Sequence, residues 1–216
     1  MRVEQLLRLN ADRVPDKVAL VAGERRWTYS QLDGLSDELA QGLVDRGIQR
    51  GDRVVLMLDN CIEAAAAMFA VLKAGAVISP VDPATPATKL KHILNDYSAK
   101  ALITHDCSIA AAADAVSTAP SIRLALVADA DVVPDIGGFV HWDEVLTAPR
   151  FSLLARTRGR SFDLAMLVYA PTSADDPKGV NVTHQNIVGG ATSVCEFGGH
   201  EVLAAIKYGA TLVIHQ

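Results

Sequence analysis

Short, unbroken apolar runs that alternate with helical segments constrain the fold of this chain more than any other feature. The runs lie at residues 53–58, 77–81, 101–104 and 123–127, with helical segments between them at 61–73, 85–97 and 109–117. Strands of a parallel sheet are buried on both faces and are therefore apolar throughout, and a helix connects each strand to the next. The order predicts an α/β fold in which a parallel sheet is flanked by helices.

The amino-terminal segment adds further elements to this pattern. Apolar residues recur at helical spacing over residues 3–14, and Pro15 ends that helix. Two short segments at 18–21 and 26–29 predict strands around a turn. Ser30 is expected to cap a helix that runs to residue 46.

The pattern loosens between residues 128 and 160, where prolines, glycines and mixed charges replace the apolar runs. Beyond it the expected elements are a strand at 162–169, helices at 184–196 and 201–208, and a strand at 211–214. We therefore predict an N-terminal α/β subdomain at 1–130, a loose junction at 131–161 and the start of a second α/β lobe at 162–216. The last strand has no helix after it, so we expect the isolated chain to self-associate there.

Charge and composition exclude several partners. The 216 residues include 20 basic and 25 acidic side chains, for a net charge of −5, whereas binding to nucleic acids or anionic membranes needs clustered lysine and arginine. No apolar run reaches the roughly 20 residues of a membrane-spanning helix. Cys61, Cys107 and Cys195 are widely spaced and odd in number, so neither a metal site nor a disulfide framework is predicted. We expect a cytoplasmic location.

Three stretches carry a family resemblance. The first is WTYSQL at 27–32 with GDRV at 51–54, the second is LKAGAVISPVDP at 72–83, and the third runs from residue 169 to residue 186. The third stretch contains PKGV followed by Thr183, His184 and Asn186. In this order they resemble the N-terminal part of the adenylate-forming (AMP-binding) superfamily of acyl-CoA and aryl-CoA ligases and adenylation domains.

The resemblance implies a reaction and its cofactors. In this superfamily a carboxylate is joined to ATP with release of pyrophosphate, and the acyl group then passes to a thiol, usually that of coenzyme A. The implied ligands are therefore ATP with magnesium, coenzyme A and a small-molecule carboxylate, for which a fatty acid is the default expectation. The first two motifs are turns and caps that identify the fold, so function is expected in the third.

The third motif departs from the family's phosphate-binding loop. The family loop reads Tyr-Thr-Ser-Gly-Ser/Thr-Thr-Gly-x-Pro-Lys-Gly, and here Thr172 and Asp175 replace its first two glycines while Pro171 lacks an N–H. Asp175 and Asp176 also bring carboxylates toward the expected phosphates. At ~5 Å and an effective dielectric of about 20, each such repulsion costs roughly 3 kcal/mol before screening. We expect a degenerate loop that binds ATP weakly.

Four side chains remain as candidates for the ATP phosphates: Thr172, Ser173, Lys178 and Thr183. No catalytic residue and no metal ligand is assigned. Two alternatives stay open for the loop, namely an ordinary surface turn and a magnesium ion held by paired aspartates that restores phosphate binding.

These features predict a truncated or degenerate relative of an ATP-dependent acyl-CoA ligase with little activity of its own. The family's adenine-recognition segment, its ribose-binding aspartate and its C-terminal lysine domain are expected beyond residue 216. One alternative is a part of a split ligase that another protein chain completes. Another is a non-catalytic binding module.

Overall fold

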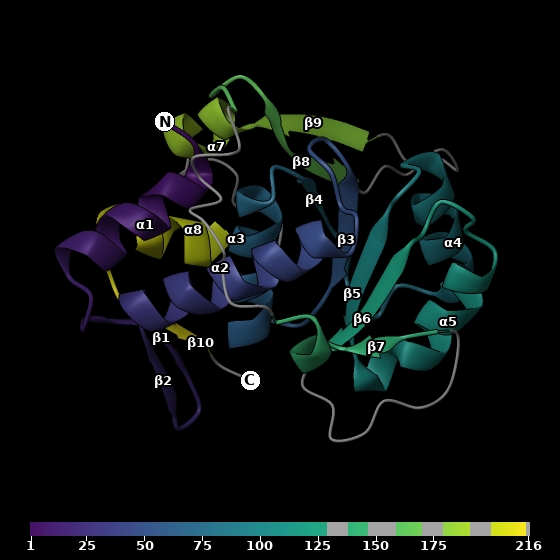
Figure 1. Cartoon of the computed structure of the whole chain (residues 1–216), viewed down its shortest axis with the longest axis horizontal. Helices are drawn as coiled ribbons and strands as arrows, with labels where there is room; N and C mark the ends of the chain where they lie inside the picture. Colours follow the sequence, from purple (N-terminus) through teal and green to yellow (C-terminus); the bar gives the residue numbers. More distant parts are fainter. Residues whose placement is uncertain (129–137, 147–158, 170–178, 191–199, 215–216) are drawn as a thin grey trace.

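The computed structural model describes residues 1–128, 138–146, 159–169, 179–190 and 200–214. These residues form two sheets with helices packed around them (Figure 1). The larger sheet has the strand order β7-β6-β5-β3-β4-β8-β9, and every neighbouring pair is parallel except β8 with β9. Its strands are β3 (Arg53–Met57), β4 (Val77–Pro80), β5 (Ala101–His105), β6 (Leu124–Ala128), β7 (Val140–His141), β8 (Leu164–Tyr169) and β9 (Gly179–Thr183).

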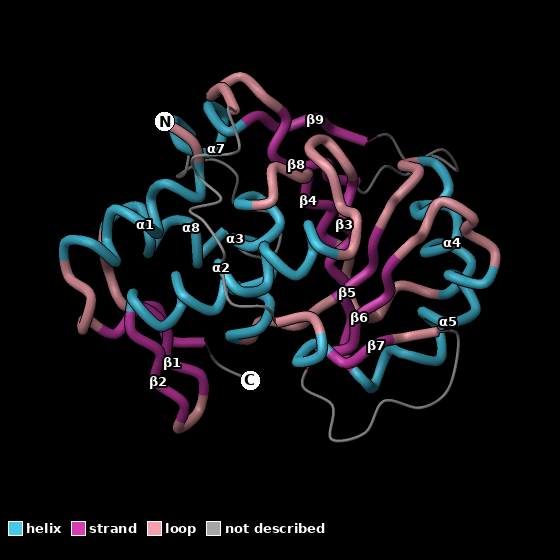
Figure 2. The backbone as a smooth tube through the Cα atoms, viewed as in Figure 1, coloured by secondary structure: helices cyan, strands magenta, loops and turns pink. Residues whose placement is uncertain are grey.

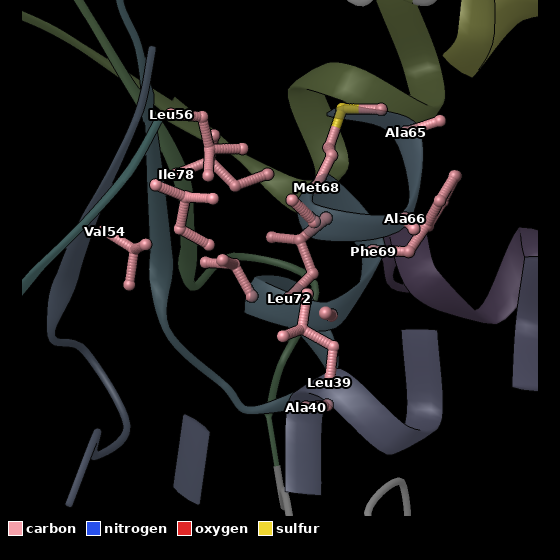
Figure 3. Packing of buried hydrophobic residues seen from close by; sticks show 14 of the residues in the cluster. Leu39, Ala40, Val54, Leu56, Ala65, Ala66, Met68, Phe69, Leu72 and Ile78 are labelled. Carbon is pink, nitrogen blue, oxygen red and sulfur yellow. The ribbon is translucent and has the colours of Figure 1, made fainter. Parts of the chain in front are cut away.

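Helices cover both faces of the larger sheet, as Figure 2 shows. Val54 and Leu56 of β3 point into one core with α2 and α3, whereas the intervening Val55 and Met57 point into a second core with α4 and α5. Figure 3 shows β3 and β4 packed against Met68 and the neighbouring turns of α3. The predicted α/β fold with a parallel sheet between helices is confirmed. The helices are α1 (Val3–Arg13), α2 (Tyr29–Asp45), α3 (Ile62–Lys73), α4 (Ala87–Asp96), α5 (Ile109–Ser117), α7 (His184–Gly190) and α8 (His200–Tyr208), with 3-10 turns η1 (Asp106–Ser108) and η2 (Trp142–Glu144).

The cap of α2 differs from the prediction. Thr28, not Ser30, is the N-cap, because its hydroxyl accepts a hydrogen bond from the Gln31 N–H at 3.3 Å. The Gln31 side chain in turn accepts from the Thr28 N–H at 2.9 Å. This reciprocal pair satisfies two N–H groups that a helix start leaves open, and it places the first turn two residues earlier than Ser30 would.

Strand β9 was not predicted. It pairs antiparallel with β8, so the larger sheet is not wholly parallel. All its residues are exposed or half-buried, and Val180 is 47% exposed. A strand that buries neither face has no apolar run to reveal it. Strand β7, which is short, was not predicted either, and it lies within the predicted junction.

The segment from 200 to 214 packs on the amino-terminal elements. Strand β10 (Leu212–Ile214) runs parallel to β1 (Val18–Ala22), which pairs antiparallel with β2 (Arg25–Thr28), in a three-stranded sheet of order β10-β1-β2. The Asn10 side-chain amide donates to the Ile206 carbonyl at 2.6 Å, and the Tyr29 hydroxyl donates to the Ala210 carbonyl at 2.7 Å. Strand β8 joins the larger sheet beside β4. The described contacts therefore link the expected second lobe to both sheets of the expected first, and the boundaries at 130 and 161 stay a prediction. Self-association through β10, an edge strand, also stays a prediction.

A buried ion cluster fixes α3 against α2. The Lys73 side chain has no exposed surface, and its Nζ lies 2.7 Å from carboxylate oxygens of both Asp33 and Asp37. Nζ also donates to the Ser36 hydroxyl at 2.7 Å and to the Asp33 carbonyl at 2.8 Å. Arg8 on α1 contacts Asp33 from the solvent side at 2.9 Å. Three helices therefore meet at one buried ammonium group.

Candidate functional site

The neck of the β8–β9 hairpin is the part of the candidate site that the structure describes. Tyr169 ends β8, Gly179 begins β9, and the two residues face each other in the ladder. Three of the four candidate phosphate ligands, Thr172, Ser173 and Lys178, lie between them and outside the described residues. The aspartates proposed to hold magnesium, at 175 and 176, lie in the same interval.

Aromatic packing surrounds this neck. Tyr97, which follows α4, stacks on Tyr169 with ring centroids 4.7 Å apart and planes inclined by 28°. The Tyr169 hydroxyl donates to Asp96 Oδ2 at 2.5 Å. Burial, together with the nearby Asp96 carboxylate, raises the pKa of Tyr97 to about 12, and the same two causes raise the pKa of Tyr169. Both phenols are therefore protonated at neutral pH, and neither is placed to act as a base.

Gly179 is required at the neck by the approach of Tyr97. A Cβ added at this position would lie 2.5 Å from the Tyr97 hydroxyl oxygen, 3.1 Å from its Cε1 and 3.2 Å from its Cζ. Any other residue would displace the ring. The glycine of the Pro-Lys-Gly element thus has a packing role in this chain that is independent of phosphate.

Thr183, the fourth candidate, is engaged in a local cap. Its hydroxyl donates to Asn186 Oδ1 at 2.7 Å and accepts from the Asn186 N–H at 3.2 Å, while the Thr183 N–H also bonds Asn186 Oδ1 at 3.1 Å. These bonds start α7. The hydroxyl would have to leave Asn186 before its proton could be donated to a phosphate oxygen, so its assignment as a phosphate ligand stays a prediction.

His184 is a buried, neutral residue with a structural partner. The Val3 N–H donates to its Nδ1 at 3.2 Å, and Glu4 Oε2 lies 3.5 Å from the same nitrogen. Burial, aided by the positive charge of Arg2, lowers the pKa of His184 to about 4. Burial likewise raises the pKa of Glu4, whose carboxylate pairs with Arg2 at 3.0 Å. The motif histidine ties α7 to the start of α1.

A cavity of about 370 Å³ opens at the amino ends of β3, β4 and β8. Its lining includes Arg2, Arg50, Arg53, Asp163 and His184. The Arg160 N–H donates to the Asp163 carboxylate at 2.7 Å, and Arg50 pairs with the same carboxylate at 2.6 Å; both interactions lower the pKa of Asp163. The cavity has both charged and apolar residues in its lining and lies at the opposite end of β8 from the hairpin neck.

The described ranges show neither a cluster of metal-ligating side chains nor a helix suited to span a membrane. Within 1–128, 138–146, 159–169, 179–190 and 200–214, no three His, Cys, Asp or Glu side chains gather as metal ligands would. In those same ranges, none of the helices combines the length and the hydropathy needed to cross a bilayer.

Sequence reasoning missed Tyr97 and the structural roles of the motif residues. Tyr97 is the last residue of the helix predicted at 85–97, and nothing in its spacing links it to residue 179. Its place at the neck depends on the packing of the end of α4 against the end of β8, which is a tertiary feature. The capping of α7 by Thr183 could have been read from a threonine three residues before an asparagine.

Comparison with known proteins identifies the family. Residues 7–215 match the family model described as AMP-binding enzyme. The chain belongs to the AMP-binding family. The resemblance predicted from the three motifs is thereby confirmed, and the fold is that of the N-terminal part of adenylate-forming ligases.

Individual AMP-binding relatives are similar over most of this chain. Malpibaldin synthetase of Mortierella alpina is 34% identical over 186 residues, which are 86% of this chain and 3% of that protein. A medium/long-chain-fatty-acid–CoA/3-oxocholest-4-en-26-oate–CoA ligase of Mycobacterium marinum is 30% identical over 82% of this chain and 33% of its own length.

Solved structures share the fold. The anthranilate CoA ligase AuaEII, solved with anthranoyl-AMP, superposes with a TM-score of 0.89 at 18% identity and covers 100% of this chain. MbtA of Mycobacterium smegmatis gives a TM-score of 0.86 at 29% identity, again over 100% of this chain. This chain spans 45% and 44% of those two proteins, respectively.

Proposed function

We propose that these residues form the N-terminal part of an ATP-dependent ligase that activates a carboxylate as an acyl-adenylate. The observation that carries the proposal is the AMP-binding family match over residues 7–215. The relatives include a fatty-acid–CoA ligase, which supports a fatty acid as first candidate substrate and coenzyme A as acceptor. Because the relatives also include peptide synthetases, other small carboxylates remain alternative substrates.

Within this function we propose that the loop at 170–178 binds the ATP phosphates, and that it binds them weakly. Lys178 supplies the positive charge, and Thr172 and Ser173 supply hydroxyl donors, as electrostatic stabilisation of a polyphosphate requires. Asp175 and Asp176 oppose this by like-charge repulsion unless magnesium lies between them and the phosphates. We expect ATP to bind no tighter than about millimolar, a free energy near −4 kcal/mol.

Two alternatives differ in what the chain needs to work. In a split ligase, another chain supplies the rest of the catalytic apparatus, and adding that chain restores turnover. In a non-catalytic module, the protein binds a ligand without turnover. A cytoplasmic location is proposed for all three, supported by the wide spacing of the cysteines, of which Cys61 and Cys107 are free thiols.

Repair of the loop tests the assignment. The variant carries Pro171→Ser, Thr172→Gly, Asp175→Gly and Asp176→Asn, which restores backbone donors and removes two carboxylates. Calorimetric titration with Mg-ATP should show a gain of about tenfold or more, since about 1.4 kcal/mol corresponds to one decade. Adding Lys178→Ala to the repaired variant should cancel that gain.

Pyrophosphate exchange with a panel of fatty and aromatic acids distinguishes binding from adenylation. We expect binding to recover in the repaired variant without exchange from these residues alone. Exchange well above background would show that the 216 residues hold a complete active site. A low-micromolar affinity in the unrepaired protein that depends on magnesium would favour the metal-assisted loop, and no gain from repair would refute the loop assignment.

A further inference from the structure

The hairpin neck is held from outside the hairpin by a residue that no motif contains. Tyr97 lies on the chain 72 positions before Tyr169, at the end of α4, yet its ring stacks on Tyr169 at 4.7 Å and abuts Gly179 on the facing strand. One ring therefore contacts both the last residue of β8 and the first residue of β9.

The backbone before and after Tyr97 fixes the direction of the ring. The Tyr97 N–H bonds the Ile93 carbonyl at 3.1 Å, and the Ala99 N–H bonds the Leu94 carbonyl at 2.9 Å, which closes the end of α4. Between them Ser98 has a φ of +48°, the left-handed conformation that ends many helices and that a non-glycine residue adopts only at an energetic cost. Because these bonds define the end of α4, the backbone holds the Tyr97 ring in one position.

The Tyr97 side chain is 8% exposed, and the Tyr169 hydroxyl donates its proton to Asp96 rather than to Tyr97. The ring, through the stack and the contact with Gly179, is thus the part of Tyr97 that holds the neck.

We propose that Tyr97 is a positioning residue for the hairpin neck: its ring holds Tyr169 and Gly179, the two described residues that flank the proposed phosphate loop. The proposal rests on the proposed function for its consequence in nucleotide binding, but the positioning itself does not depend on it. Tyr97 acts through Tyr169 and Gly179, which its ring contacts.

The first test follows trypsin cleavage after Lys178, the bond next to Gly179, in the full chain and below its melting temperature. Tyr97→Ala should be cleaved there several-fold faster than the wild type, whereas Tyr97→Phe, which keeps the ring, should match the wild type and melt no lower. Leu94→Ala is the matched control, since Leu94 is fully buried on the same helix and its loss lowers stability without releasing the neck. Equal cleavage rates for Tyr97→Ala and Leu94→Ala would overturn the proposal.

A double-mutant cycle tests the contact from the other strand. Gly179→Ala should accelerate cleavage in the wild-type background because its Cβ displaces the ring, and should have little further effect in Tyr97→Ala. Additive effects of the two substitutions would contradict the proposed contact.

Addition of excess Mg-ATP separates this proposal from the proposed function. If ATP slows cleavage of the wild type, that protection should be lost in Tyr97→Ala and kept in Tyr97→Phe; protection unchanged in Tyr97→Ala would overturn the proposal. If ATP protects no variant while Tyr97→Ala is still cleaved faster than Leu94→Ala, the positioning stands and the phosphate-loop assignment fails.

Discussion

Replacing Lys73 by methionine should be the most damaging single change of charge in the described part of this protein. The ammonium group is fully buried between α2 and α3 and lies within 2.8 Å of four oxygens, two of which belong to carboxylates. Methionine keeps the length and much of the volume of the side chain. The substitution therefore removes the charge and the hydrogen bonds with little change in packing.

The magnitude follows from what the substitution leaves behind. Asp33 and Asp37 would remain in place with side chains 5% and 22% exposed. Removing one partner of a buried ion pair costs about 3–5 kcal/mol, because the remaining charge is then uncompensated. Arg8, at 2.9 Å from Asp33 and 46% exposed, compensates in part, so we expect a loss near the lower end, about 3 kcal/mol.

Urea unfolding followed by circular dichroism measures this loss, with Lys89→Met on the exposed surface of α4 as the control. The control should lie within about 0.5 kcal/mol of the wild type. Adding Asp33→Asn and Asp37→Asn to Lys73→Met should recover much of the stability, because the cost comes from stranded carboxylates. A loss below about 1 kcal/mol for Lys73→Met, or a further loss on neutralising the carboxylates, would refute this account of the cluster.

Three further outcomes are expected. Gly42→Ala should lower the stability of the protein by more than about 2 kcal/mol, because its Cβ would lie 1.7 Å from the Val145 carbonyl oxygen. Gly34→Ala in the same helix is the control: its Cβ meets nothing within 4 Å, so in thermal melts it should stabilise the protein by up to about 1 kcal/mol. Burial lowers the pKa of His184 from 6.5 to about 4, so between these pH values the imidazole binds a proton in the unfolded chain but not in the folded one. The unfolding free energy should therefore fall by up to roughly 3 kcal/mol between pH 7 and pH 4. This dependence on pH should be absent from His184→Gln. Burial raises the pKa of the Cys61 thiol to about 12, so iodoacetamide at pH 8 should alkylate it far more slowly in the native protein than in urea, as mass spectrometry would show.

The parallel core of the fold could be predicted from the sequence because its signal is local. Strands β3, β5 and β6 are buried on both faces, so each contains an apolar run, and the helices between them end at glycines or polar turns. Gly75, which closes the turn after α3, has a φ of +78°, as its place after a helix suggests. Strand β9 gave no such signal because it buries neither face.

The candidate site could be predicted only as a stretch of sequence. The family loop was recognised from its Pro-Lys-Gly element, but the contacts at its neck come from Tyr97 and Asp96, which are remote in the chain. The same holds for His184, whose neutral state depends on burial beside Arg2 and on an N–H from Val3. Contacts between segments that are distant in the chain produce no recognisable pattern in the sequence of either segment.

The structure also changes what the second half of the phosphate-loop motif means in this chain. Gly179 is needed by the approach of Tyr97, Thr183 and Asn186 cap α7, and His184 joins α7 to α1. Each of these residues, which match the family pattern, is accounted for by folding alone. Their presence therefore gives no independent support to ATP binding, and the positions that decide it are Pro171 to Lys178, where the family's glycines are replaced. A protein could lose phosphate binding at those positions while folding still held the rest of the motif in place, which is why repair of the loop, rather than mutation of the residues that match, is the informative experiment.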